Sequence, residues 1–367
     1  MKGIESQSFI GKTILLRVDF NVPVKDERIL DDSRIKVALS TILYLLKSCE
    51  KLVLISHLGR PTGRNNARFK LKRVASHLSD LLKIRKAVKK VKIKNFLGYQ
   101  ISPKIFLLEN IRFYKEEEKN DLRFAKKLAS LGNVYVNDAF SVSHREHAST
   151  EGITRFLPSF AGFELQKEFT ALSRLIKNPK KPFICILGGA KVSDKIEIIK
   201  SLAKKVDWFL LGGAMASTFL ASMDINLKDS LIAKDKINIA VKIWKKFGEK
   251  IILPSQVIFG HRNNKTAILD IGESEVKKFS QYLKDAKTIF WNGTLGKTEI
   301  PKYSKSSNKL AQIIAVSKAF TVVAGGDTIA FLNNLKLLNK FSYVSYGGGA
   351  SLEFLSGKKF KSLTRLF

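Results

Sequence analysis

The stretch Phe183-Ile-Cys-Ile-Leu-Gly-Gly-Ala-Lys-Val-Ser-Asp-Lys-Ile-Glu-Ile-Ile199 has the pattern of a strand, a glycine turn and a helix. Its continuous apolar run, Phe183 to Leu187, is typical of a strand that is buried on both faces of a sheet. The two glycines that follow permit a tight turn and close approach of the backbone. Val192, Ile196 and Ile199 then recur at spacings of four and three, which predicts a helix with one inward face.

Two lysines of this stretch, Lys191 and Lys195, stand four apart, so we expect them on neighbouring faces at the helix start. Two ammonium groups beside free backbone N–H groups suit a polyanion such as a phosphate in transfer. The spacing leaves a second interpretation equally open, because lysine is abundant here and two on one helix could be solvated by chance. The stretch has neither the Gly-Lys-Ser/Thr ending of a Walker A loop nor the Gly-x-Gly-x-x-Gly of a dinucleotide site.

The composition is that of an ordinary globular protein. A chain of 367 residues, 45% of them apolar, predicts two domains with sizeable cores and excludes a disordered chain. The start Met1–Gln7 lacks the apolar core of a signal peptide, and no run of about 18 apolar residues predicts a membrane span. Cys49 and Cys185 form no Cys-x-x-Cys or zinc pattern, so we expect a reduced, cytoplasmic setting.

The formal net charge of +33 is the most unusual bulk property. A field of that sign favours nucleic acid, acidic membrane surfaces or anionic substrates. The lysines are dispersed, however, and the densest run, Lys83 to Lys94, alternates with apolar residues like a solvated helix or strand edge. Compositional drift is therefore favoured over a specific nucleic-acid site, and we expect no membrane partner.

The first half of the chain alternates apolar runs with helical patterns. The expected strands are Ile14–Phe20, Leu52–His57, Ile105–Glu109 and Val134–Phe140. The expected helices run from Asp32 or Ser33 to Leu46, from Leu71 to Leu82 and from about Leu122 to Leu131. Repeated strand–helix units predict a parallel sheet that is covered on both faces, with ligands beyond the carboxyl ends of its strands.

Polar side chains gather at those expected strand ends. They are Asp19, Asn21, Arg34, His57, Arg60, Asn110, Arg112, Asp138, His144, Arg145 and His147. Arginine is much rarer than lysine in this chain, and its guanidinium pairs bidentately with carboxylate and phosphate. The pattern favours an anion site, although some of these arginines could instead cap helices or bridge surface acids.

The second half follows a long helical pattern from Gly162 to Lys177, which predicts a rigid connector. Strand–glycine–helix units then recur at Trp208–Ala214, Thr288–Gly293, Val322–Thr328 and Tyr343–Ser351. One glycine pair is weak support for phosphate binding, but several in one half are stronger. Asp327 opens one of these helices and could hold Mg²⁺ with Thr328 beside it. The alternative for Asp327 is a plain N-cap.

Several long motifs stand in a fixed order along the chain. They are Arg17-Val-Asp-Phe-Asn-Val-Pro23, Asp32-Ser-Arg34, Ser56-His-Leu-Gly-Arg-Pro61, Leu108-Glu-Asn-Ile-Arg-Phe113, Asn137-Asp-Ala-Phe140, His144-Arg-Glu-His147, Gly188-Gly-Ala-Lys-Val-Ser-Asp-Lys195, Gly325-Gly-Asp-Thr328 and Gly347-Gly-Gly-Ala-Ser351. With this set the chain closely resembles the phosphoglycerate kinase family over nearly its full length.

The resemblance implies an α/β protein with two Rossmann-like three-layer domains and parallel sheets, joined by a helix across a deep cleft. The implied parts are an N-terminal 3-phosphoglycerate-binding domain (1–161), a connecting helix or hinge (162–180), a C-terminal nucleotide-binding domain (181–350) and a tail that returns to the N-terminal domain (351–367). The implied reaction is reversible, Mg²⁺-dependent phosphoryl transfer between 1,3-bisphosphoglycerate/ADP and 3-phosphoglycerate/ATP in glycolysis. We expect direct in-line transfer after hinge closure, by a monomer.

The same resemblance assigns roles to individual residues. It implies catalytic roles for Arg34, Lys191 and Lys195. It places the substrate on Asp19, Asn21, Arg34, His57, Arg60, Arg112 and Arg145. It places the nucleotide on Lys191, Lys195, Gly212, Gly213, Asn292, Glu299, Gly325, Gly326, Asp327 and Thr328. It assigns Mg²⁺ to Asp327.

The chain departs from the family's pattern at a few positions. Thr294 stands where a proline is usual, Thr298 replaces a phenylalanine, Ala324 replaces a glycine, and Tyr346 replaces a threonine. These changes bear on nucleotide affinity and rate, and they leave one alternative open. That alternative is a degenerate, weakly active or inactive paralogue that acts as a basic anion- or nucleic-acid-binding protein.

Overall fold

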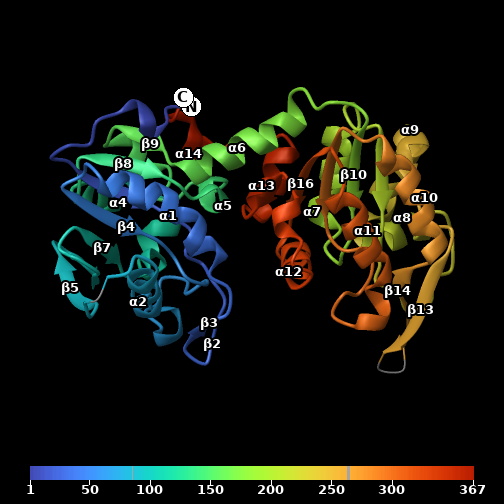
Figure 1. The fold of residues 1–367 in the computed structure, drawn as a ribbon, viewed down its shortest axis with the longest axis horizontal. Coiled ribbons are helices and arrows are strands. Elements are labelled where there is room, and N and C mark those ends of the chain that lie inside the picture. Colours follow the sequence, from blue (N-terminus) through green and yellow to red (C-terminus); the bar gives the residue numbers. More distant parts are fainter. Residues whose placement is uncertain (85, 263–264) are drawn as a thin grey trace. The chain divides into compact units, whose positions relative to one another are not determined.

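The computed structural model describes residues 1–84, 86–262 and 265–367. The chain divides into two compact α/β units, each with one main sheet (Figure 1). Unit 1 comprises Met1–Phe169 together with Lys359–Phe367, and unit 2 comprises Thr170–Lys358. The division falls inside helix α6, Phe163–Ile176, which continues from one unit into the other.

The main sheet of unit 1 has the strand order β5-β6-β7-β4-β1-β8-β9. Its strands are β1 (Thr13–Arg17), β4 (Lys51–Ile55), β5 (Lys89–Ile93), β6 (Phe96–Gln100), β7 (Ile105–Leu108), β8 (Val134–Asn137) and β9 (Ser159–Ala161). The pairs from β7 through β9 are parallel, which confirms the expected parallel sheet. The sequence did not predict that β5 and β6 extend it as an antiparallel edge. The lysines of β5 line that edge, where charge discourages pairing with other chains.

Helices cover both faces of this sheet. They are α1 (Ser33–Leu46), α2 (Lys72–Leu81), α3 (Lys115–Glu118), α4 (Leu122–Ala129), α5 (Phe140–Ser143) and α14 (Lys361–Thr364), with short 3-10 turns at Ile4–Ser6, Ala67–Phe69, Ile111–Phe113 and Gly152–Arg155. Leu16 and Leu54 belong to one buried cluster and Leu15 and Val53 to another. Because successive strand residues point to opposite faces, the continuous apolar runs serve two cores at once.

All four expected strands of unit 1 end earlier than predicted. β4 stops at Ile55 instead of His57, and β7 stops at Leu108 instead of Glu109. The expected strand Ile14–Phe20 stops at Arg17, and the expected strand Val134–Phe140 stops at Asn137. Side chains take over the backbone bonds there: the Phe20 N–H donates to Ser56 Oγ at 2.9 Å, and the Ala139 N–H donates to Asn137 Oδ1 at 3.0 Å. The residues that follow form loops, and Phe140 begins α5.

Of the expected tail 351–367, residues 359–367 belong to unit 1 and residues 351–358 to unit 2. The Phe360 ring lies 5.7 Å from the Phe140 ring, and the Ser362 hydroxyl donates to the Ser143 carbonyl. The Lys2 N–H donates to the Leu366 carbonyl at 2.6 Å, so the two termini lie side by side (Figure 1). Among the described residues, no helix combines the length and apolar character that a membrane span requires.

The main sheet of unit 2 is parallel throughout, in the order β12-β11-β10-β15-β16-β17. Its strands are β10 (Phe183–Leu187), β11 (Trp208–Leu211), β12 (Ile251–Ile252), β15 (Thr288–Asn292), β16 (Phe320–Ala324) and β17 (Tyr343–Ser345). Every residue of β10 is buried, as its unbroken apolar run predicted. Antiparallel β13 (Val257–Arg262) and β14 (Lys265–Ile271) form a separate hairpin. A further two-stranded hairpin, β2 (Val24–Lys25) with β3 (Arg28–Ile29), belongs to unit 1.

The helices of unit 2 follow its strands. They are α7 (Ser193–Leu202), α8 (Gly213–Ala221), α9 (Ile237–Phe247), α10 (Glu273–Lys284), α11 (Lys305–Ala315), α12 (Gly326–Asn334) and α13 (Gly349–Leu355), with 3-10 turns at Lys234–Lys236, Gly248–Lys250, Pro301–Tyr303 and Leu338–Lys340. Because α7 begins at Ser193, Lys191 precedes the helix. The expectation that both lysines stand on it was wrong for Lys191.

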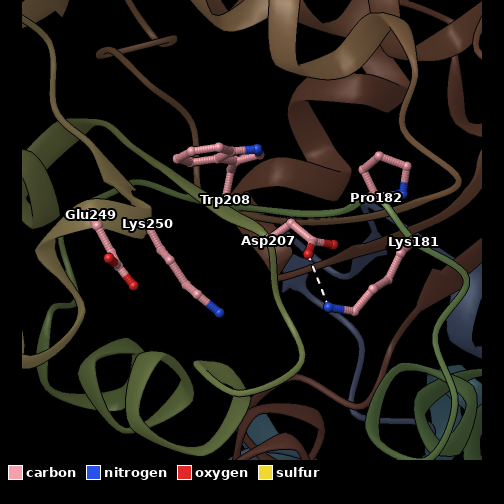
Figure 2. Close-up of a pocket in the computed structure, with 6 residues that line it drawn as sticks. All are labelled: Lys181, Pro182, Asp207, Trp208, Glu249 and Lys250. Atoms are coloured by element: carbon pink, nitrogen blue, oxygen red, sulfur yellow. Dashed lines mark hydrogen bonds and ion pairs between the residues drawn. The ribbon is translucent and has the colours of Figure 1, made fainter.

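A pocket of about 530 Å³ opens at the amino-terminal edge of this sheet (Figure 2). Lys181 and Pro182 precede β10, Asp207 precedes β11, and Lys250 precedes β12. The pocket is therefore at the opposite edge of the sheet from the glycine turns, which follow the carboxyl ends of the same parallel strands.

Candidate functional site

In unit 1 the loops after β1 and β4 are tied together by polar side chains. Asp19 accepts a hydrogen bond from the Asn21 N–H at 3.0 Å, and its other carboxylate oxygen contacts the Arg34 guanidinium and the Ser141 hydroxyl. Asn21 Oδ1 in turn accepts the Gly59 N–H at 2.8 Å. Three of the expected substrate residues, Asp19, Asn21 and Arg34, are thus brought together at the carboxyl edge of the sheet.

His57 lies at the centre of the expected arginine group and is only 3% exposed. Burial, followed by the charges of Arg112, Arg17, Arg34 and Arg145, holds the pKa of His57 well below its usual range. The imidazole is therefore neutral at ordinary pH. Four guanidinium groups act on one buried ring. A bound anion would reduce the repulsion among these positive charges.

Arg112 is as deeply buried as His57, with 3% of its surface exposed. Its Nη1 donates to the Gly59 carbonyl at 2.9 Å, and its Nε lies 3.4 Å from Glu118 Oε1. Burial, with the neighbouring charges of Arg17 and Arg145, lowers the pKa of Arg112 to about 10. Arg112 still carries its charge at neutral pH, so the site holds a desolvated cation that suits a carboxylate or phosphate.

The other two expected substrate arginines are less constrained. Arg60 is exposed, whereas Arg145 is half-buried and donates from Nε to His144 Nε2 at 3.1 Å. His147 lies nearby with Nδ1 3.8 Å from Glu117 Oε1. Burial, together with the charges of Arg112, Arg17 and Arg145, lowers the pKa of His147 to about 3, so this ring is also uncharged at neutral pH.

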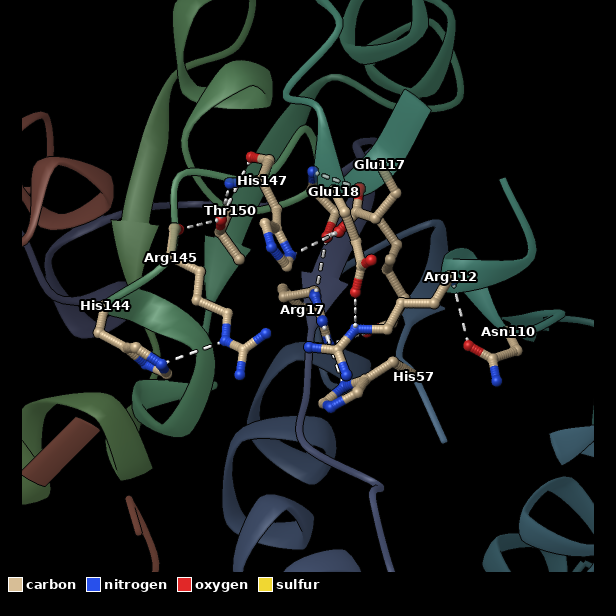
Figure 3. A network of polar contacts seen from close by, with 12 residues as sticks. Arg17, His57, Asn110, Arg112, Glu117, Glu118, His144, Arg145, His147 and Thr150 are labelled. Atoms are coloured by element: carbon tan, nitrogen blue, oxygen red, sulfur yellow. Dashed lines mark hydrogen bonds and ion pairs between the residues drawn. The ribbon is translucent and has the colours of Figure 1, made fainter. Parts of the chain in front are cut away.

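Sequence reasoning assigned no role to Arg17, which links β1 to the polar residues around His57. Arg17 ends β1 and is fully buried; it donates from Nε to Ser149 Oγ at 3.0 Å and from Nη1 to the Val18 carbonyl at 2.6 Å (Figure 3). Ser149 also bonds to both carboxylate oxygens of buried Glu117. Burial raises the pKa of Glu117, although the charge of Arg17 opposes that shift. The sequence feature that could have identified Arg17 is its position, since it is a charged residue in an otherwise apolar strand.

In unit 2 the glycine turns that follow neighbouring strands pack against one another. The Gly188 N–H donates to the Asn292 carbonyl at 3.0 Å, and the Gly293 N–H donates to Thr328 Oγ1 at 2.8 Å. Gly213 has a φ of +51°, and a Cβ there would lie 2.8 Å from the Gly189 nitrogen. Glycine is therefore required at this close approach of two backbones.

Lys195 enters this cluster from the first turn of α7. Its buried Nζ donates to the Gly188 carbonyl, and burial lowers its pKa to about 8 although Asp327 acts in the opposite direction. Lys191, in contrast, is exposed on the loop between Gly189 and the helix. The two lysines thus present one desolvated and one solvated ammonium group on the same strand–turn–helix unit.

The remaining expected nucleotide residues surround these turns. Gly212 is the N-cap of α8, Gly325 is the N-cap of α12, and Gly326 and Asp327 lie in the first turn of α12. Asn292 is buried at the end of β15, whereas Glu299 is exposed on the loop beyond it. The structure thereby gathers Gly212, Gly213, Asn292, Gly325, Gly326, Asp327 and Thr328 at one edge of the unit 2 sheet.

Asp327 meets the chemical requirements of a magnesium ligand. Its carboxylate is exposed at the start of α12, beside the glycine turns. Mg²⁺ is usually held by one or two carboxylates, substrate phosphates and water rather than by a protein cage. Among residues 1–84, 86–262 and 265–367, no three or more His, Cys, Asp or Glu side chains are grouped so that they could hold a metal ion by themselves.

The fold and these two sites define a class of protein. Two α/β units with mainly parallel sheets, one with clustered arginines and the other with packed glycine turns beside a buried lysine, are the parts of a small-molecule phosphotransferase. A family model described as phosphoglycerate kinase matches residues 4–358. The chain belongs to the phosphoglycerate kinase family, and it is accordingly a kinase of glycolysis.

Individual relatives agree with this assignment. A phosphoglycerate kinase of Borreliella burgdorferi (strain ZS7) is 44% identical over 373 residues, which cover 96% of this chain and 95% of the relative. One of Dictyoglomus turgidum is 43% identical, over 97% of this chain and 96% of the relative. These similarities do not favour the alternative of a degenerate binding protein.

Solved structures of the family have the same fold. That of phosphoglycerate kinase from Coxiella burnetii superposes with a TM-score of 0.86 at 34% identity, covering 99% of this chain and 98% of that one. The enzyme from Pyrococcus horikoshii OT3 gives a TM-score of 0.87 at 30% identity, over 100% of this chain and 98% of that one. The expected architecture of two α/β units with parallel sheets is thus confirmed.

Proposed function

We propose that the chain transfers a phosphoryl group reversibly between ATP and the carboxylate of 3-phosphoglycerate, giving ADP and 1,3-bisphosphoglycerate. The observation that carries this proposal is the convergence of Arg34, Arg112 and Arg145 on the neutral, buried His57. A compact acid that bears both a phosphate and a carboxylate offers two anionic ends for such a group, and arginine forks bind either end bidentately.

In unit 1 the proposed roles follow from the contacts. Arg34 forms an ion pair with Asp19. During the reaction Arg34 would exchange the Asp19 carboxylate for the phosphoryl group in transfer and would offset its negative charge. Asn21 fixes the Gly59 loop, and Arg112 is anchored on the same loop through the Gly59 carbonyl. Asp19 and Asn21 thus orient the site, while His57, Arg60, Arg112 and Arg145 bind the substrate.

In unit 2 we assign the nucleotide to the edge that carries the glycine turns. Backbone N–H groups at the starts of α8 and α12 would face its phosphates, with Lys191 and Lys195 adding charge. The residues proposed to contact it are Lys191, Lys195, Gly212, Gly213, Asn292, Glu299, Gly325, Gly326, Asp327 and Thr328. Asp327 would hold Mg²⁺, which neutralises phosphate charge when bound.

The transfer needs alignment and charge neutralisation more than covalent help, so we propose direct in-line transfer without a phosphoenzyme. The two proposed sites belong to different units, so the reaction requires a movement that joins the two ligands and excludes water. We assign part of that hinge to α6, because the division between the units falls within this helix.

The family departures near the nucleotide edge are compatible with activity. Thr294 replaces the usual proline, yet its Oγ1 donates to the Gly296 carbonyl at 2.9 Å and its own carbonyl accepts the Gly189 N–H at 2.8 Å. Hydrogen bonds therefore hold the loop that a proline would stiffen. Thr298, Ala324 and Tyr346 are expected to tune nucleotide affinity and leave the reaction class unchanged.

The test is ATP-dependent phosphorylation of 3-phosphoglycerate, coupled to NADH oxidation by the next enzyme of the pathway. Wild type is compared with Arg34→Ala and Lys191→Ala, and exposed Arg123→Ala and Lys200→Ala serve as matched charge controls. We expect both site variants to lose at least about a hundredfold in rate and both controls to stay near wild type. Absence of activity in folded wild type would contradict the proposal.

Two further assignments accompany this function. We propose that the enzyme acts in the cytoplasm, because glycolytic substrates are small soluble anions. We also propose that it acts as a monomer, because both sites lie within one chain. Light scattering behind size exclusion would check the second point: a mass well above 41.2 kDa at assay concentration would contradict it.

A further inference from the structure

A second pocket lies in unit 1, between the β2–β3 hairpin and α2, and encloses about 720 Å³. Its lining includes four basic side chains, Arg28, Lys70, Lys72 and Arg73, and two carboxylates, Glu27 and Asp80. None of these residues belongs to the substrate set of the proposed reaction. Sites for small molecules typically enclose about 300–1,000 Å³, so the pocket has room for a ligand of metabolite size.

The charges of this pocket are only partly balanced by the protein itself. Glu27 pairs with Arg73 across the pocket wall. Arg28, Lys70 and Lys72 are all exposed and form no ion pair with any of the described residues. Three cations therefore face a shared concave space that contains a single further carboxylate, Asp80. Like charges in such a concavity repel, and a bound anion would remove that cost.

The neighbouring acid Asp32 does not neutralise the pocket, because its own partners occupy it. Asp32 Oδ1 lies 2.9 Å from Lys36 Nζ, and Asp32 Oδ2 lies 2.9 Å from His77 Nε2. His77 lines the pocket, so this pair also fixes one wall in place. One wall of the pocket is thus fixed by residues with defined partners, while Arg28, Lys70 and Lys72 in its lining have no ion pair among the described residues.

The start of α2 contributes little beyond its side chains. The helix has ten residues, and no side chain caps its first turn, which carries Lys72 and Arg73. The N–H groups of a helix start carry a partial positive charge. At this helix the Glu109 carboxylate already offsets part of that charge, because its Oε1 accepts the Leu71 N–H at 2.8 Å. The side-chain cations therefore make the site.

The pocket of unit 2 provides a useful contrast (Figure 2). Its Lys181 Nζ lies 3.0 Å from Asp207 Oδ1, and its Lys250 Nζ donates to the Ala203 and Val206 carbonyls at 3.0 and 3.2 Å. Both lysines of that pocket are therefore paired with other groups of the protein. The unit 1 pocket differs because its cations remain available to a ligand.

We propose that the pocket formed by the β2–β3 hairpin and α2 binds a small polyanion with several phosphate charges, at a site separate from the substrate arginines. Arg28, Lys70 and Lys72 supply the free charges, and Arg73, held by Glu27, completes the basic wall. The volume of about 720 Å³ is that of a site for a single small molecule, which favours a free phosphorylated small molecule over an extended nucleic-acid strand.

The test uses inorganic tripolyphosphate as the probe, titrated calorimetrically at about 0.15 M ionic strength, where the field of distant surface charges is screened. Saturating 3-phosphoglycerate and ADP occupy the proposed catalytic sites. The pocket variant is Arg28→Gln/Lys70→Gln/Lys72→Gln. The matched control, Lys89→Gln/Lys90→Gln/Lys92→Gln, removes the same charge from exposed positions on β5 of the same unit.

We expect wild type and the control variant to bind tripolyphosphate alike, and the pocket variant to bind at least tenfold more weakly with an unchanged melting temperature. Amide shifts on titration should map to residues 27–29 and 70–77 in wild type, which checks the location without any substitution. Equal weakening in both triple variants would overturn the proposal, because the general positive field would then explain binding. Loss of binding on adding 3-phosphoglycerate and ADP to wild type would also overturn it.

Discussion

Arg17 Nη2 lies 3.3 Å from His57 Nδ1, and both side chains are buried (Figure 3). A guanidinium has donors only, so Nδ1 must accept and the imidazole proton must reside on Nε2. Protonation of Nδ1 would place a second donor against the guanidinium. The arrangement therefore presents His57 as a neutral ring with a single, directed N–H, while the surrounding positive charge comes from the arginines.

This relationship predicts the protonation behaviour of His57. In wild type, ¹⁵N NMR should show a neutral Nε2–H tautomer at pH values below 6.5, where an unperturbed imidazole would be protonated, because burial and four arginine charges hold the pKa of His57 well below that value. Arg17→Gln should raise the pKa of His57 toward its ordinary value of about 6.5. An imidazolium at pH 7 in wild type would contradict the assignment.

Arg17→Gln should also cost stability. Removing one partner from a buried charged network costs about 3–5 kcal/mol, because Glu117 and Ser149 would lose their link to it. Urea unfolding measures this change. Arg17→Lys is the matched comparison, because it keeps the positive charge but loses the several N–H donors of the guanidinium. We expect a smaller loss of stability than in Arg17→Gln, together with a mixture of the two neutral His57 tautomers.

Lys195 predicts a pH dependence of nucleotide use. Its pKa of about 8 in the free enzyme means that the ammonium form is lost as pH rises through that value. If the charged form binds phosphate, kcat/KM for ATP should fall on the alkaline side with an apparent pKa near 8. The arginine of Lys195→Arg cannot deprotonate in this range, so the alkaline fall of kcat/KM should shift to higher pH in this variant. An unchanged limb in a folded Lys195→Arg enzyme would remove Lys195 as its cause.

Asp138 predicts an unusual pH dependence of stability. Its Oδ1 accepts the N–H groups of Glu164 and Leu165 at the start of α6, at 2.8 and 3.1 Å. Burial raises the pKa of Asp138 to about 7, so between its unfolded value of 3.8 and 7 the folded protein binds more protons than the unfolded chain. The contribution of this group to the free energy of unfolding therefore falls as pH rises through that window.

Asp138→Asn is the variant that isolates this effect. An amide oxygen can still accept the two N–H bonds, so we expect the stability of the variant to depend less on pH between about 4 and 7 and to exceed wild type near pH 7. Asp121→Asn, which changes the half-buried N-cap of α4, is the matched control. Denaturant midpoints across the pH series measure both. Parallel wild-type and Asp138→Asn curves would contradict the raised pKa.

Two glycines of the nucleotide edge should respond differently to alanine. Gly213→Ala places a Cβ 2.8 Å from the Gly189 nitrogen at a φ of +51°, so both a clash and backbone strain oppose folding. We expect a loss of at least about 1–3 kcal/mol. A Cβ at Gly326 meets no atom within 4 Å, so Gly326→Ala should fold like wild type. If the nucleotide binds there, the KM for ATP alone should rise.

The sequence alone determined the order of the buried parallel strands and of the helices that follow them, because a strand buried on both faces has a continuous apolar run and a helix buried on one side has a periodic one. It did not show the antiparallel strands β5 and β6. The run Phe183–Leu187 became a fully buried strand, and the helix expected from Asp32 or Ser33 to Leu46 was observed as α1. The order of the motifs also determined the family. These properties are local, so neighbouring residues suffice to show them.

Only the tertiary structure decided which side chains share a site and in what ionisation state. Arg17, Ser149 and Glu117 are far apart in the chain, and only the pairing of β1 with its neighbours joins them beneath His57. The apolar runs could not show where β1 and β8 end, because loop side chains such as Ser56 terminate the backbone pairing there. Desolvation depends on every element that packs around a group, and a linear pattern does not contain that information.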